Sequence, residues 1–231
     1  GHEVYQRRGN VLVSKNKGAR IWSMRLDGSD IQVHAGGGMD NPVEIDFTPE
    51  GEIWGSVNLF YGRPRGDTLV HWQLGGRYPR YDQGAVLEEF PKTGPVLTEA
   101  YNFGHIGISG MCILNGENRI LSTGFNTQEV FETAFDADWQ NPQTRQFLTI
   151  DDPNVHLTDV LEDANGDLLV IDTGGWFRIG CPTSQIAKPE IPGAIYRIRK
   201  SGIRDRKTDF RGNEIAWQDL DFAQLAELLG D

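Results

Sequence analysis

Two histidines directly precede predicted strands, where a side chain is well placed to act on a ligand. His105 comes just before a strand that starts near Ile108, and His156 comes just before another, with Asp159 three residues further along. A histidine close to a carboxylate can act as a general base held in orientation by its partner, or the two can bind a hard cation. A hydrogen-bonded loop histidine beside a turn-forming aspartate is the structural alternative, and the sequence leaves both open.

His71 lies within a predicted strand rather than before one. Residue alternation places it on the strand face opposite Val70 and Trp72. It is a candidate catalytic base, with Asp67 and Arg80 nearby in the sequence. It could equally be a strand histidine whose ring is satisfied by a neighbouring carboxylate or backbone group.

Asp172 ends a predicted apolar strand and opens a loop that contains Gly174, Gly175 and Trp176. An aspartate at the end of a buried strand, followed by glycines that allow close backbone approach, is a common form of binding loop. The alternative is an aspartate whose carboxylate caps exposed backbone amides in a turn. Both interpretations stay open.

Composition excludes several classes of protein. The chain of 231 residues has 22 Lys and Arg against 33 Asp and Glu, a net charge of −11, which argues against a nucleic-acid or anionic-membrane binder. Its apolar runs are all shorter than the roughly 20 residues of a membrane span. Two cysteines, Cys112 and Cys181, exclude a disulfide scaffold and a four-cysteine zinc site, and leave one disulfide or two free thiols open.

The elements that must position these residues are short strands. Strand-like runs rich in β-branched and aromatic residues alternate with Gly, Pro, Asn and Asp throughout the first two hundred residues. Strand–turn–strand units with glycines at 51, 116 and 166 recur at intervals of about 50 to 65 residues. Helical periodicity is present only at the end, from Leu220 to Leu229.

This repeat predicts an all-β fold, a β-propeller of four-stranded blades. A β-sandwich is the alternative, since it also has many short strands. About three and a half blades can be counted, so we expect part of a propeller over residues 1–202, followed by a linker and the start of a helical segment over 203–231. A partial ring leaves apolar faces uncovered. We therefore expect the missing blades to come from a longer chain, another chain or an oligomer.

Five motifs in order carry a family resemblance. They are NPVEIDFTPEGE (41–52), PRGDTLVHWQLGGRYPR (64–80), DTGGWF (172–177), CPTSQIAKPE (181–190) and GAIYRIR (193–199). Together they resemble the propeller domain of PVC-type membrane-bound dehydrogenase-like, haem-binding proteins, whose propellers are similar to soluble quinoprotein glucose dehydrogenase. The resemblance implies a six-bladed ring, followed by helical repeats and a cytochrome-like domain.

The resemblance also implies a function: an extracytoplasmic, periplasmic or secreted oxidoreductase for a sugar or polyol, with pyrroloquinoline quinone (PQQ) and Ca2+ as cofactors. The catalytic groups would come from His71, His105, His156 and Asp159. The cofactor-binding groups would be Arg80, Asp172, Gly174, Gly175 and Trp176, and no particular metal ligands are assigned. The chain has no Cys-x-x-Cys-His, so it holds no covalent haem by that route. The alternative is a non-enzymatic module that binds a glycan or a protein, which six tryptophans and the negative charge would suit.

Overall fold

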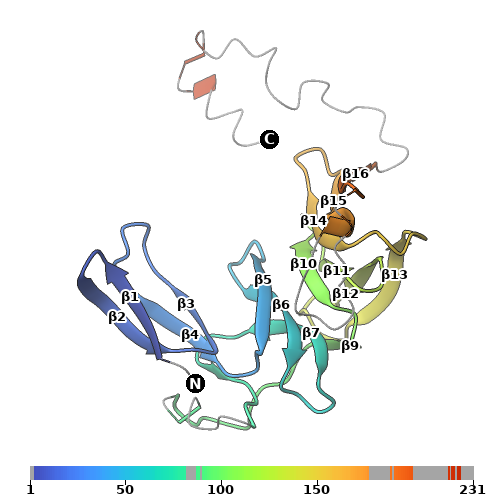
Figure 1. Cartoon of the computed structure of the whole chain (residues 1–231). Coiled ribbons are helices and arrows are strands. Elements are labelled where there is room, and N and C mark those ends of the chain that lie inside the picture. The colour runs from blue at the N-terminus through green and yellow to red at the C-terminus, as the bar shows by residue number, and fades with distance from the viewer. Residues whose placement is uncertain are drawn as a thin grey trace.

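The strands of the computed structural model form a series of mostly antiparallel sheets that follow one another along an open arc (Figure 1). The structure describes residues 3–81, 87–88, 90–176, 188, 190–199 and five positions between 218 and 224. At the N-terminus, β1 (Glu3–Arg8) pairs with β2 (Val11–Lys17). We call the next four groups of strands blades 1 to 4.

Blade 1 contains β3 (Arg20–Ser23), β4 (Gln32–Gly36) and β8 (Gly76–Arg77). Blade 2 contains β5 (Asn41–Phe47), β6 (Ile53–Phe60), β7 (Gly66–Trp72) and β9 (Tyr101–Gly104). Blade 3 contains β10 (Ile108–Ile113), β11 (Arg119–Gly124), β12 (Glu129–Ala134) and β13 (Gln143–Thr149). Blade 4 contains β14 (Leu157–Glu162), β15 (Leu168–Asp172) and β16 (Ala194–Ile198), with a 3-10 turn at Gly174–Trp176.

The predicted all-β fold with four-stranded propeller blades is confirmed, since blades 2 and 3 each have four antiparallel strands. The glycines at 51, 116 and 166 occupy the hairpin turns with φ of 88°, 69° and 72°, a conformation that favours glycine. The predicted helix from Leu220 to Leu229 lies outside the described residues apart from four positions. The predicted division of the chain at residue 202 therefore stays a prediction.

Apolar side chains between neighbouring blades form the core. One cluster joins blade 1 to blade 2, and includes Ala35, Val57, Val70, Trp72 and Tyr78. A second joins blade 2 to blade 3, with Trp54, Leu69, Met111 and Ile120 among its members. A third joins blade 3 to blade 4, with Leu121, Val130, Leu157, Val160 and Val170 among its members.

One connection departs from the predicted pattern. The strand expected to run on to Leu74 ends at Trp72, and the chain then leaves blade 2 so that β8 pairs in parallel with β4 of blade 1. The amide of Gly75 donates to the carbonyl of His34 (2.6 Å), and the amide of Tyr78 donates to that of Gly36 (2.9 Å). A turn at Gly75, with φ of 75°, makes this exit possible. Blade 2 is thereby tied to blade 1 by backbone as well as by side chains.

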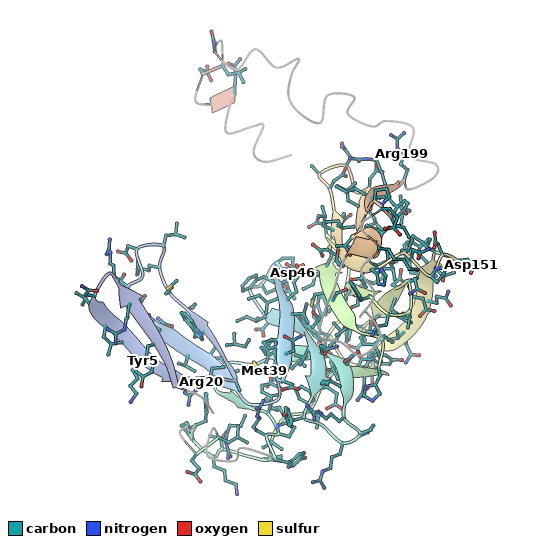
Figure 2. All side chains as sticks on the ribbon, viewed as in Figure 1. Tyr5, Arg20, Met39, Asp46, Asp151 and Arg199 are labelled. Carbon is teal, nitrogen blue, oxygen red and sulfur yellow. The ribbon has the colours of Figure 1, made fainter. Side chains whose placement is uncertain are left out.

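The innermost strands β5, β10 and β14 run in the same direction. Glu44 and Asp46 of β5 accept hydrogen bonds from the amides of Met111 (2.7 Å) and Ile113 (2.8 Å), so the two strands advance together. Figure 2 shows β5 running from the neighbourhood of Met39 toward the labelled Asp46. We call the edge at which these three strands begin the entry edge, and the edge at which they end the exit edge.

Candidate functional site

The entry edge carries two loops that each precede an inner strand. His105 lies in the loop between β9 and β10, and His156 lies in the loop before β14. These are the two histidines that the sequence placed just before strands. The structure therefore brings their loops to one edge of the arc, where the mouth of a propeller channel lies.

The loop before β10 is organised by a buried carboxylate, Asp67, which is 1% exposed. Its Oδ2 accepts hydrogen bonds from the amides of Ile106 (2.9 Å), Gly107 (2.7 Å) and Ile108 (3.3 Å). Its Oδ1 accepts one from Leu59 (3.0 Å). Both oxygens of Asp67 are thus occupied by the backbone, while the neighbouring His105 side chain is exposed.

The loop before β14 is organised in a similar way by Asp172, which is 5% exposed. Its Oδ1 accepts hydrogen bonds from the amides of His156 (2.8 Å) and Gly174 (2.7 Å). This oxygen therefore caps backbone amides, as the second of the two interpretations of Asp172 expected. Its Oδ2 has a hydroxyl contact with Tyr196 at 3.5 Å, the limit of a hydrogen bond. Burial, followed by the neighbouring Asp172 charge, raises the pKa of Tyr196.

The ring of His156 is held in one orientation by two carbonyl groups. Its Nδ1 lies 3.0 Å from the carbonyl oxygen of Asn154 and 3.0 Å from that of Gly174. A carbonyl oxygen only accepts, so Nδ1 carries the hydrogen, and the neutral ring presents a lone pair at Nε2. The ring also packs 4.6 Å from that of Phe125. This is the arrangement that a general base or a metal-binding histidine needs.

The two loop glycines are packed against the chain itself. A Cβ on Gly174, whose φ is 65°, would lie 2.6 Å from the carbonyl oxygen of Ile191, and a Cβ on Gly175 would lie 2.9 Å from Cβ of Lys188. The space beside both glycines is therefore occupied by Lys188 and by the Ile191–Gly193 segment. Lys188 in turn donates to the side chain of Asn154 (2.7 Å), which places an ammonium group beside the His156 loop. The side chain of Trp176 lies outside the described residues.

Arg80 belongs to a cluster of arginines and tyrosines at the entry edge of blade 2. Its guanidinium lies 4.2 Å from the centre of the Tyr61 ring and donates to the carbonyl of Met39. Arg65 stacks on the same ring at 4.3 Å and pairs with Asp40 at 2.8 Å.

Arg63 extends this cluster, since its guanidinium lies 4.4 Å from the centre of the Tyr81 ring. Of these three arginines, sequence reasoning had singled out only Arg80. The Arg63-Pro64-Arg65 run beside Tyr61 was the available signal for the other two guanidinium groups.

His71 lies toward the exit edge, away from His105 and His156. On β7 it is opposite Trp54, one position from the strand end that pairs with the start of β6. Its Nε2 is 2.8 Å from Oε2 of Glu52, and its ring stacks on Trp54 with centroids 4.8 Å apart and planes 4° apart. The structure does not bring the three predicted histidines into one site, and the catalytic role of His71 stays a prediction.

Asp159 is paired with a carboxyl group rather than with His156. It lies on β14 and interacts with the carboxyl group of Glu44 on β5, beside the intervening β10. Burial, with the neighbouring Asp159 and Asp46 charges, raises the pKa of Glu44 to about 7, and burial also raises that of Asp159. Sequence reasoning missed Glu44, because the two residues are in different blades and no local pattern connects them.

Two further features of the described part of the chain bear on function. No group of three or more His, Cys, Asp and Glu side chains that could hold a metal ion occurs among these residues. They also contain no helix long and apolar enough to span a membrane.

Cys112 is buried, and burial raises the pKa of its thiol to about 11. Cys181 lies outside the described residues, so a disulfide between the two cysteines stays an open prediction.

The chain matches no protein-family model and no curated sequence. It is similar in structure to two solved glucose dehydrogenases. The first is 16% identical over 77% of this chain and 49% of the other, with a TM-score of 0.50. The second is also 16% identical over 77% of this chain, covers 48% of the other, and has a TM-score of 0.51. This chain therefore spans about half the length of these proteins and shares their propeller fold.

Proposed function

We propose that this chain is part of a quinoprotein-like oxidoreductase that acts on a sugar or polyol at the entry edge. Two findings support the proposal: a propeller fold shared with glucose dehydrogenases, and a sequence resemblance to PVC-type dehydrogenase-like proteins. The observation that carries it is the His156 ring, whose Nδ1 is fixed by two carbonyls so that Nε2 is the free base. Its mechanism would begin with removal of a hydroxyl proton from the substrate by that atom.

The chain's own residues would support this step by orientation. Asp172 fixes the backbone of His156 and of Gly174, and the carbonyl of Gly174 in turn fixes the imidazole ring. The Lys188 ammonium group, bonded to Asn154, holds the other side of the same loop. The unfilled acceptor capacity of Asp172 Oδ2 could orient a substrate hydroxyl.

Three arginines at the entry edge suit the carboxylate groups of the cofactor that the resemblance implies. PQQ is a tricarboxylate, and guanidinium groups bind carboxylates well. Arg65 and Arg80 present two such groups against the Tyr61 ring, and Arg63 presents a third against Tyr81, the residue that follows Arg80. When bound, the quinone would accept the hydride of the substrate. Of the predicted cofactor-binding residues, Arg80, Asp172, Gly174, Gly175 and Trp176 stay proposals. Ca2+ is proposed from the resemblance alone.

The family of the protein, its location and the source of the missing blades are also proposals. By the same resemblance we place the protein in the PVC-type dehydrogenase-like family, outside the cytoplasm. The missing blades would be supplied by a longer polypeptide, another chain or a second copy. Exposed apolar residues support this part: Val43, Ile45 and Phe47 on β5 are 42%, 43% and 54% exposed, and Ile195 on β16 is 68% exposed.

The test uses the full-length protein, with PQQ and CaCl2 added and dye reduction measured over a panel of sugars and polyols. We expect PQQ to raise the melting temperature and dye reduction to follow. His156→Gln should lower kcat by about 100-fold or more while keeping the PQQ-induced shift. The matched control is His34→Gln in blade 1, whose ring bonds to Ser23 (2.7 Å). It should change neither result.

Two outcomes would overturn the proposal. One is the absence of both dye reduction and a PQQ-induced shift. The other is an equal loss of kcat in the His156 and His34 variants. Thermal shifts with glycans but none with PQQ would support the binding module instead.

A further inference from the structure

Among the strands that the structure describes, only β11 pairs with the inner strand β10, so one edge of β10 has no strand beside it. On one side it pairs with β11, and on the other its amides donate to carboxylates of blade 2. Glu44 and Asp46 of blade 2 accept the amides of Met111 and Ile113, at 2.7 and 2.8 Å. Just beyond the end of β10, Glu162 of blade 4 accepts the amide of Asn115 at 2.7 Å. Carboxylates thus bind the inner strands of three blades together.

Two of these inner-strand carboxyl groups meet directly. Glu44 of blade 2 and Asp159 of blade 4 converge on the same part of β10, where Glu44 accepts the amide of Met111 and Asp159 lies beside Gly110, and the two carboxyl groups are within interaction range of each other. A Cβ on Gly110 would lie 2.3 Å from Oδ1 and 2.5 Å from Cα of Asp159, so only glycine leaves room for this approach. Asp159 Oδ1 also accepts the amide of Val160 (2.7 Å). A hydrogen bond between two carboxyl groups needs a proton on one of them.

The charge of Asp46, two residues along β5, also acts on the pair, since it contributes to the raised pKa of Glu44. The charges of Asp46, Asp159 and Glu162 in turn act on the thiol of Cys112 on β10, so the groups around the pair are acidic. Burial, then the charges of Asp159 and Asp46, raises the pKa of Glu44 to about 7, and burial raises the pKa of Asp159. Two carboxylates held in contact cannot both ionise without repulsion. Protonation therefore decides whether the pair attracts or repels.

We propose that Glu44 and Asp159 form a proton-operated clamp, which holds the inner strands of blades 2, 3 and 4 together when one proton is shared and loosens them when both groups ionise. This clamp does not depend on the redox function proposed above. It would make the spacing between the inner strands β5, β10 and β14 depend on pH. When both groups ionise, their repulsion would move β5 and β14 away from β10.

The sign of the effect follows from linkage. A carboxyl group whose pKa is raised in the folded state binds a proton that the unfolded chain releases. Its stabilising contribution is complete below the ordinary pKa of 4.5 and is lost as pH rises to about 7. Stability from this pair should therefore fall between about pH 5 and 8, in contrast to a salt-bridged carboxylate.

The test is the melting temperature of the full chain from pH 4.5 to 9, for the parent protein and Glu44→Gln. A glutamine keeps an oxygen for the Met111 amide and gives an N–H to Asp159, so it imitates the protonated state. We expect the two proteins to coincide near pH 5 and Glu44→Gln to melt at least about 3 °C higher at pH 8. The matched control is Asp46→Asn, on the same strand with the same kind of amide bond. It should keep the fall in stability with rising pH and move its midpoint only slightly to lower pH, because the charge of Asp46 is the smallest of the causes that act on the pKa of Glu44.

Hydrogen exchange gives a second readout. In the parent, amides of the 108–115 segment should lose protection above pH 7, after correction for the intrinsic pH dependence, and in Glu44→Gln they should not. Asp159→Asn, whose amide can donate to Glu44, serves if Glu44→Gln fails to fold, and should give the same flat profile. Parallel melting profiles of the parent and these variants, with unchanged exchange across pH 7, would overturn the clamp.

Discussion

The loops that enter β10 and β14 are built alike and differ in what they leave unused. In each, a buried aspartate accepts backbone amides of the loop that precedes the inner strand. Asp67 uses both oxygens on four amides, whereas Asp172 uses Oδ1 on two amides and has a 3.5 Å contact with Tyr196 at Oδ2. Both oxygens of Asp67 therefore hold the backbone of the fold. Oδ2 of Asp172 can still accept a further hydrogen bond.

The two histidines differ in the same way. His105, beside the Asp67 loop, is exposed, while His156, beside the Asp172 loop, has its ring fixed by two carbonyls. A histidine before an inner strand is therefore not by itself a functional signal. What distinguishes the second loop is a fixed tautomer next to a partly unoccupied carboxylate, and this is why the proposal places the base at His156.

The largest expected effect of a single change tests the role assigned to Asp67. Asp67→Ala removes the acceptor from four amides, including that of Leu59, whose φ of 62° is strained for leucine. We expect a loss of about 3 to 5 kcal/mol, or a fall in melting temperature of roughly 10 °C.

Asp172→Ala, which frees two amides, should cost about half as much. Thermal unfolding of both variants measures the difference. If Asp172→Ala were the more destabilising change, the contrast between a consumed and a partly free carboxylate would be wrong. Asp67→Asn, which retains one acceptor oxygen, keeps the test possible if the alanine variant does not fold.

The second comparison uses two glycines with the same backbone conformation. Gly107 and Gly174 both have φ of 65°, so an alanine pays a similar conformational penalty of about 1 kcal/mol at each. A Cβ at Gly107 meets the Asn126 side chain at 2.7 Å, which can move. A Cβ at Gly174 meets the backbone of Ile191 and Pro192 at 2.6 Å, which cannot move as easily.

Gly174→Ala should therefore destabilise by about 2 to 4 kcal/mol and Gly107→Ala by about 1 kcal/mol. Denaturant unfolding separates the two values. Gly94→Ala is a suitable control, since a Cβ there meets nothing within 4 Å. Equal losses at 107 and 174 would show that Ile191 and Pro192 do not pack against the loop after β15 as described.

The sequence predicted the local structure better than the site because the two rest on different interactions. Strand alternation and the turn glycines at 51, 116 and 166 are local, and the hairpins formed where expected. The orientation of His156 depends on the carbonyl of Gly174 across a loop, and the Glu44–Asp159 pair depends on how three blades pack. Neither arrangement can be predicted from the spacing of residues in the sequence. In the second, Asp159 pairs with Glu44 of another blade and not with His156, three residues before it.

The smallest expected effect concerns the histidine–carboxylate pair at the exit edge. His71 and Glu52 are joined at 2.8 Å, but the Glu52 side chain is 56% exposed, in contrast to the buried Asp67 and Asp172. Solvent screening limits such a pair to about 0.5 kcal/mol, so Glu52→Gln should lower the melting temperature by no more than about 2 °C. His71 remains stacked on Trp54, so we expect the fluorescence of that tryptophan to change little. A loss of several degrees, approaching that of Asp172→Ala, would mean that exposure does not separate the carboxylates of the two edges.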